Sequence, residues 1–149
     1  MGKNKITIAF DLSSIDSAHK HRGIGFYTKN LWEELKKMDQ KSKSITIKPI
    51  SEIKQSKSPN TIFHYPAFNP FFFSFPIQSI KQSIITVHDL IPIQYKQHYP
   101  PGIKGNLKWQ IQKFALRFAK HIITDSNASK QSIVKLTGIS PKNFTSIHL

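Results

Sequence analysis

The stretch that decides the fold is residues 83–95, which read Ser-Ile-Ile-Thr-Val-His-Asp-Leu-Ile-Pro-Ile-Gln-Tyr. Residues 84–87 are all β-branched and carry no charge, which is typical of a strand buried on both faces of a parallel sheet. The strand is followed by His88 and Asp89, and Pro92 stops it from continuing because proline has no N–H to donate. Ligands of open α/β sheets bind just outside the carboxyl ends of such strands, so this polar pair is a candidate for chemistry.

Other strands and helices alternate around this stretch. Short apolar or alternating runs predict strands at Ile6–Phe10, Ile45–Ile50, Thr61–Tyr65 and His121–Thr124, and one beginning at Phe144. Helices are predicted to begin near Gly23 and after Gly102, and a third runs to Leu136 between the N-cap Ser126 and the terminator Gly138. This alternation predicts a doubly wound, mostly parallel α/β sheet in a single domain over residues 1–149.

The helix after Gly102 carries one apolar stripe, of the kind that packs against a core. Its members recur every three or four residues: Ile103, Leu107, Ile111, Phe114, Ala115 and Phe118. The other face carries the basic residues Lys104, Lys108, Lys113, Arg117 and Lys120.

The composition is that of a globular protein. The chain has 149 residues, 38% of them hydrophobic, and no apolar run approaches the roughly 20 residues that cross a bilayer. The absence of cysteine excludes disulfides and thiolate metal sites and fits a reducing compartment. We therefore expect a cytoplasmic protein.

The formal net charge of +14 predicts an anionic partner, either nucleic acid, acidic lipid or a phosphorylated small molecule. Only Arg22 and Arg117 are arginines among the 22 basic residues, and a lysine-rich mixture can also arise from codon bias. Because nucleic-acid readers favour arginine for bidentate contacts, the composition favours peripheral docking on the inner face of an anionic membrane over nucleic-acid binding.

The connector between the strands at Thr61–Tyr65 and residues 83–87 is rich in aromatic residues. Five phenylalanines lie in the range 68–75, among prolines. Two interpretations stay open: the rings pack onto the domain as a stiff lid, or they form an exposed apolar patch that contacts a membrane interface or a lipid-like acceptor.

A glycine loop opens the first long helix. Gly23 and Gly25 would let an anion approach the free N–H groups of the helix N-terminus, and Arg22 beside them favours phosphate. The spacing is not a dinucleotide fingerprint, which would require glycine at Thr28. The alternative is an ordinary turn and helix cap.

The chain resembles the N-terminal half of family 4 glycosyltransferases, particularly bacterial mannosyltransferase-like members. The matching segments, in family order, are Arg22–Tyr27, Phe63–Pro66, Thr86–Pro92, Tyr99–Pro101, Ala119–Lys130 and Leu136–Asn143. The resemblance implies a GT-B architecture, in which two Rossmann-like domains face a cleft. It also implies sugar transfer with retention of configuration, from a nucleotide-sugar such as a GDP- or UDP-sugar to a glycan or lipid-linked acceptor, without a bound metal.

The resemblance also implies roles for single residues. His88 matches the family histidine that reaches the donor sugar near the reacting carbon, while Gly23 and Gly25 match the loop near the donor diphosphate, where N–H groups stabilise developing charge. His64 and Tyr65 lie where acceptors tend to be recognised. Asp89 is interpreted as orienting either a loop or the His88 ring. A metal site from His64, His88 and His98 is not expected, because their spacing matches no known pattern.

The C-terminal, donor-binding domain of the family is absent from these 149 residues, so we expect it to act in cis or in trans, and the chain alone to be inactive and to hold no cofactor. Two further classes remain as alternatives. One is a non-catalytic membrane-docking or partner subunit of a two-chain glycosyltransferase, and the other is a basic nucleic-acid-binding domain.

Overall fold

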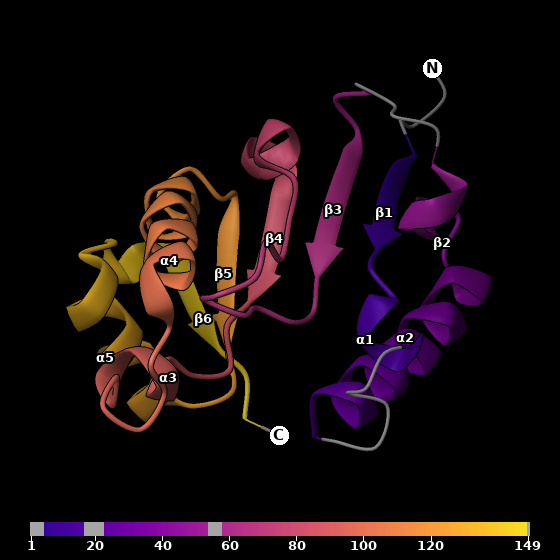
Figure 1. The fold of residues 1–149 in the computed structure, drawn as a ribbon. Coiled ribbons are helices and arrows are strands. Elements are labelled where there is room, and N and C mark those ends of the chain that lie inside the picture. Colours follow the sequence, from indigo (N-terminus) through magenta and orange to yellow (C-terminus); the bar gives the residue numbers. More distant parts are fainter. Residues whose placement is uncertain (1–4, 17–22, 54–57, 149) are drawn as a thin grey trace. The chain divides into compact units, whose positions relative to one another are not determined.

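The computed structural model describes residues 5–16, 23–53 and 58–148. The chain divides into two compact units, Met1–Pro66 and Ala67–Leu149 (Figure 1). The strand ladders within both units are parallel, and helices alternate with the strands along the chain. This confirms the predicted Rossmann-like α/β class and is consistent with the N-terminal half of a GT-B fold. The domain boundary at residues 1–149 stays a prediction.

The first unit is built on three strands. In this unit β1 (Ile6–Phe10) lies between β2 (Ile45–Pro49) and β3 (Thr61–Tyr65). The predicted strand positions are therefore confirmed to within one residue. The unit also contains α1 (Ser13–Asp16), α2 (Gly23–Lys41) and the 3-10 turn η1 (Ile50–Glu52).

The core of the first unit forms where α2 packs on β1. Phe10 is fully buried, and its ring stacks on Trp32 of α2 with the centroids 5.6 Å apart. Asp39, near the end of the same helix, accepts a hydrogen bond from the Ile47 N–H at 3.1 Å. The helix is thereby fixed to both β1 and β2.

The second unit has its own three parallel strands. In this unit β5 (His121–Thr124) lies between β4 (Ser83–Thr86) and β6 (Phe144–Ser146). Its helices are η2 (Ile77–Gln82), α3 (Ile91–Gln94), α4 (Gly102–Leu116), α5 (Asn127–Thr137) and η3 (Pro141–Asn143). None of the helices among the described residues is long and apolar enough to cross a membrane.

Both predicted ends of α5 are confirmed. The Ser126 side chain accepts a hydrogen bond from the Ser129 N–H at 3.0 Å, which is N-cap geometry. Gly138 ends the helix in the left-handed conformation at φ 70°, where a side chain would be strained.

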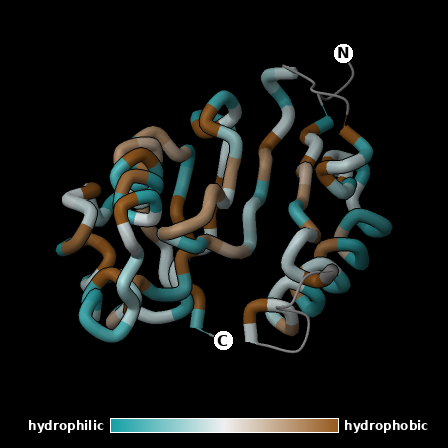
Figure 2. Tube along the Cα trace, in the orientation of Figure 1, coloured by the Kyte–Doolittle hydropathy of each residue, from teal (hydrophilic) through white to brown (hydrophobic). Residues whose placement is uncertain are grey.

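The expectation that the apolar stripe of α4 packs against the core is wrong. Ile103 is 90% exposed, and Leu107 and Phe114 are each 61% exposed. Of the stripe, only Ala115 is buried; the other buried residues of α4 are Gly105, Trp109, Gln112 and Leu116. Trp109 fills the core, and a Cβ added at Gly105 would lie only 3.0 Å from the Pro101 Cβ and 3.6 Å from the Phe71 ring. In Figure 2, hydrophobic and hydrophilic segments alternate along α4.

The aromatic connector satisfies both interpretations in part. Phe68 and Phe75 are buried, with their rings stacked at 6.1 Å, whereas Phe72 and Phe73 are 65% and 57% exposed. The buried Gln112 fixes the loop from α4. Its amide donates to the carbonyls of Asn69 and Pro70 and accepts from the Ser74 N–H, over distances of 2.9–3.1 Å.

Candidate active site

The candidate site of the second unit lies at the carboxyl ends of β4 and β5. Thr86 pairs with Ile123, and the Val87 N–H continues the ladder by donating to the Ile123 carbonyl at 2.9 Å. The next residue on each side is polar, because His88 follows Val87 and Asp125 follows Thr124. Parallel pairing therefore brings two polar side chains together at the edge where α/β proteins bind ligands.

The two side chains are in contact. His88 Nδ1 lies 3.4 Å from Asp125 Oδ2, and the side chains are 14% and 30% exposed. A carboxylate at this position favours the tautomer that carries its proton on Nδ1. Nε2 is the ring nitrogen on the opposite side from Asp125.

The backbone around Asp125 is fixed on both sides. The buried Thr124 hydroxyl donates to the Ser126 carbonyl at 3.2 Å and lies 3.2 Å from the Ser146 hydroxyl on β6. Ser126 caps α5. Asp125 is therefore held between a strand end and a helix start, and such a rigid support suits a residue that orients another side chain.

Asp89 contacts the loop rather than the sheet. Its Oδ1 accepts a hydrogen bond from the Ile91 N–H at 2.9 Å, at the start of the helical turn α3. Leu90 between them is buried. Of the two roles that the sequence left open for Asp89, this contact corresponds to ordering the loop, and the carboxylate described beside His88 belongs to Asp125.

Asp125 is not among the site residues predicted from the sequence. The signal was present, since an aspartate directly follows the buried run His121–Thr124 just as His88 follows residues 83–87. The local sequence pattern does not reveal which strands are adjacent, and only the pairing of β4 with β5 makes the two strand ends neighbours.

The two acceptor-side candidates end β3 in the first unit. His64 is 8% exposed, and its ring lies edge-on to Phe10 at 5.1 Å between centroids. Burial lowers the pKa of His64 from 6.5 to about 4, so the ring is neutral at pH 7. Tyr65 is 4% exposed. Little of either side chain is at the surface.

The glycine loop lies at the start of α2. The helix begins at Gly23, its first turn carries no acidic side chain, and a Cβ added at Gly23 would meet nothing within 4 Å. Among the described residues, neither the first turn of α2 nor a neighbouring side chain opposes the approach of an anion to this backbone. Gly25 is buried within the helix, and Arg22 lies outside the described residues.

The structure thus gathers His88 and Asp125 into one site in the second unit, with Asp89 on the adjoining loop. It places Gly23, Gly25, His64 and Tyr65 in the first unit. In the described ranges, no three His, Asp or Glu side chains form a group that could hold a metal ion.

Comparison with known proteins identifies the family. No curated protein and no solved structure matches the chain. One family model does match, that described as Glycosyltransferase Family 4, over residues 46–149. This range contains His64, Tyr65, His88 and Asp125 but begins after the glycine loop. Since the match covers more than half of the chain, the protein belongs to glycosyltransferase family 4.

Proposed function

We propose that this chain supplies the acceptor-side half of a retaining glycosyltransferase, which transfers a hexosyl group such as mannose from a GDP- or UDP-sugar. A donor-binding half, in cis or in trans, completes the enzyme. The acceptor is a glycan or a lipid-linked sugar. The observation that carries the proposal is the His88 ring at the carboxyl end of β4, oriented by Asp125 at 3.4 Å.

In the proposed reaction the bond between the sugar C1 and the diphosphate oxygen breaks. The acceptor hydroxyl forms its new bond to C1 on the same face, and its proton leaves with the nucleoside diphosphate. His88 Nε2 faces the sugar near C1. A hydrogen bond from the sugar to this nitrogen stabilises the positive charge that develops on the sugar ring.

The start of α2 has a separate role in this proposal. Negative charge grows on the departing diphosphate as the bond to C1 breaks, and free N–H groups at a helix N-terminus stabilise such charge. Gly23 supports this role because no described residue outside α2 lies within 4 Å of the position that a Cβ would take there. Gly25 and Arg22 are proposed to complete the diphosphate contact. His64 and Tyr65 are proposed to shape the acceptor side from within, as both are nearly buried.

A panel of GDP- and UDP-hexoses tests the proposal directly. The complete enzyme, containing these 149 residues and the donor-binding half, is incubated with each donor and a membrane lipid extract. We expect one donor class to release nucleoside diphosphate only when acceptor is present, and NMR of the product to show the anomeric configuration of the donor. An inverted product would contradict the retaining mechanism, and no release from any donor would contradict the activity.

A further inference from the structure

The second unit carries an apolar surface that its own core leaves uncovered, which we call the α4 face. It consists of six side chains, each between 46% and 90% exposed: Phe72, Phe73, Ile103, Leu107, Phe114 and Phe118. Isolated exposed apolar residues are ordinary, but a cluster of large ones marks an interaction site.

Three α4-face residues lie along one side of the helix. At 3.6 residues per turn, Ile103, Leu107 and Phe114 lie opposite the buried face that contains Trp109, and Phe118 follows in the turn after the helix. The stripe therefore points directly away from the core. The Phe114 and Phe118 rings contact each other edge to face, with centroids 5.2 Å apart.

A lysine of α4 contacts both phenylalanines at the tip of the loop. Lys108 Nζ lies 5.2 Å from the centroid of the Phe72 ring and 5.9 Å from that of Phe73. Gln112 holds both sides of the same loop against α4 through its hydrogen bonds to Asn69, Pro70 and Ser74. The two rings and the helix stripe thus belong to one preorganised surface.

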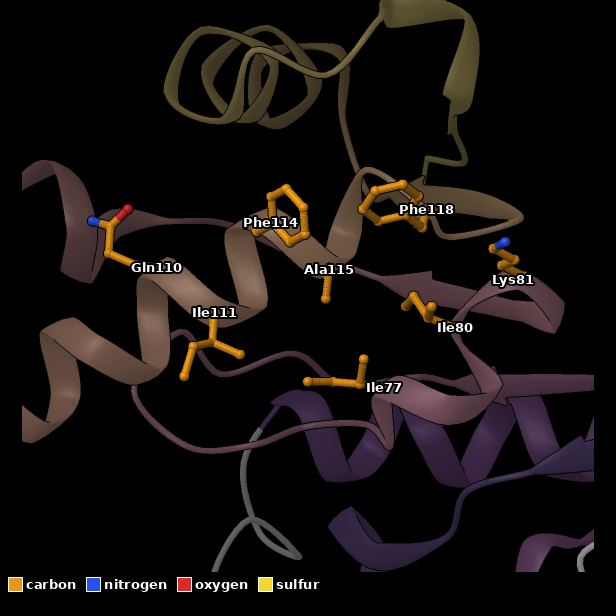
Figure 3. Close-up of a pocket in the computed structure, with 8 residues that line it drawn as sticks. All are labelled: Ile77, Ile80, Lys81, Gln110, Ile111, Phe114, Ala115 and Phe118. Atoms are coloured by element: carbon orange, nitrogen blue, oxygen red, sulfur yellow. The ribbon is translucent and has the colours of Figure 1, made fainter.

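An open groove extends the apolar surface towards η2. It has a volume of about 590 Å³ and is lined by Ile77 and Ile80 from η2 and by Ile111, Phe114 and Phe118 on the α4 side. Figure 3 shows Ile77 pointing towards α4, with Lys81 and Gln110 at opposite ends of the groove.

Positive charge surrounds the α4 face. The range 67–149 contains ten Lys and Arg residues against two acidic residues, Asp89 and Asp125. Asp125 lies beside His88, and Asp89 accepts a hydrogen bond from the loop at the start of α3. Around the α4 stripe, Lys104 and Lys108 lie on one flank and Lys113 and Arg117 on the other.

We propose that the α4 face docks on a bilayer rich in anionic phospholipids, with its aromatic and aliphatic side chains in the interface and its lysines at the headgroups. This combination of an apolar stripe with basic flanks is the pattern of interfacial helices. The phenylalanines alone would also suit a protein partner, but the flanking lysines favour the bilayer, because lysine is depleted from protein interfaces. Nucleic acid offers no partner for Ile103 or Leu107. The inference does not depend on the proposed sugar transfer.

Vesicle co-sedimentation tests the inference on the full chain. We expect binding to vesicles of 70% phosphatidylcholine and 30% phosphatidylglycerol, and weaker binding to phosphatidylcholine alone. Lys104→Gln, Lys108→Gln and Lys113→Gln should each lower the partition coefficient about fivefold, on the anionic vesicles only. Phe72→Ser with Phe73→Ser should lower it tenfold or more on both, since less apolar surface is buried.

Matched controls separate the contribution of the α4 face to vesicle binding from that of net charge and of exposed apolar side chains elsewhere. Lys135→Gln and Lys142→Gln remove charge from the same unit outside this face, and Phe26→Ser removes an exposed ring that is 56% accessible in the first unit. These variants should bind as the parent does. Loss of binding equal to that of the α4-face variants would overturn the proposal, as would no binding to anionic vesicles.

A fluorescent label reports which surface enters the interface. The chain has no cysteine, so Ile103→Cys accepts a single environment-sensitive dye at the most exposed position of the stripe. Its emission should shift to the blue on anionic vesicles, whereas a dye at Ser140→Cys should not respond. Concentration-dependent self-association in sedimentation velocity, abolished by Leu107→Ser together with vesicle binding, would overturn the proposal in favour of a second copy as the occupant.

Discussion

One nitrogen of the His88 ring, Nδ1, already contacts a carboxylate. Asp125 lies 3.4 Å from Nδ1, and both side chains stand on strand ends that pair in register. A carboxylate beside one ring nitrogen sets the orientation of a histidine before a ligand arrives. Asp125 is therefore a positioning residue whose effect is exerted through His88.

Asp125→Asn tests this positioning role. An amide keeps the shape of the carboxylate but loses the charge that favours a proton on Nδ1, so we expect kcat for transfer to fall about 10- to 100-fold with little change in KM. The imidazole nitrogen NMR shifts should show that His88 has lost its tautomeric preference. Asp89→Asn is the matched control and should leave these shifts unchanged. Unchanged shifts in Asp125→Asn itself would disprove the positioning role.

His64 gives the protein a pH-dependent stability. Because burial lowers its folded pKa from 6.5 to about 4, the unfolded chain binds a proton more readily than the folded chain. The free energy of unfolding should therefore fall as the pH drops below 6.5 and level off near pH 4. The total loss expected from this residue is about 3 kcal/mol.

Urea denaturation between pH 7 and pH 4.5 measures this loss. His64→Gln, which cannot be protonated, should have a shallower dependence of the free energy of unfolding on pH than the parent. His98→Gln, which removes an exposed histidine, is the matched control. Parallel curves for His64→Gln and the parent would show that His64 does not titrate in this range.

At the level of residues, the sequence identified His88 but not its partner. Strand ends can be recognised locally, because the β-branched runs stop at a polar residue and Pro92 forces a turn. A contact between residues 37 positions apart depends on which strands are adjacent, and no local pattern encodes that order. The burial of His64 was hidden for the same reason, since Phe10 is far from it in sequence.

At the level of elements, α4 shows how one buried amide can determine which face of a helix packs inwards. The apolar stripe is the more hydrophobic face, yet the side that packs inwards contains Gly105 and Gln112. Gln112 is fully buried and makes three hydrogen bonds to loop residues 69–74, while Trp109 supplies most of the apolar volume. A well-satisfied buried polar group of this kind can determine which packing is adopted.

Gln112→Met tests the importance of this amide. Methionine is close in size but leaves the Ser74 N–H and two loop carbonyls without their present partner, so we expect a loss of about 2–4 kcal/mol in the free energy of unfolding. Gln110→Met on the exposed side of the same helix should change it by less than about 0.5 kcal/mol. Chemical denaturation compares the two variants. Equal losses in the free energy of unfolding would contradict a stabilising role for the Gln112 hydrogen bonds to the loop.

The boundaries of the elements were more predictable than their orientation. The strands at Ile6–Phe10, Thr61–Tyr65 and His121–Thr124 were predicted at the residues where they occur, and Ser126 and Gly138 delimit α5 as expected. These signals are local, because they reside in β-branched runs and caps. Which face of α4 packs inwards is not a local property, since it depends on hydrogen bonds from Gln112 to loop carbonyls 42 and 43 residues earlier.

At the level of the whole molecule, the charge is uneven along the sequence. Residues 1–66 contain twelve Lys and Arg residues and six acidic residues, whereas residues 67–149 contain ten and two. The net charge of +14 therefore has its strongest imbalance in the unit that carries the α4 face. The total was evident from composition, but its association with an exposed apolar surface required the orientation of α4.

The measurement that tests the account most directly is sugar transfer by the complete enzyme carrying His88→Ala. If His88 contacts the donor sugar near the reacting carbon, kcat should fall about 100- to 1,000-fold while the circular dichroism spectrum and the melting temperature stay close to the parent's. His88→Gln, which retains a hydrogen-bonding group, should recover part of this loss, and His98→Ala should transfer at the parent rate. Undiminished transfer by a folded His88→Ala enzyme would contradict the assignment of His88 to the active site.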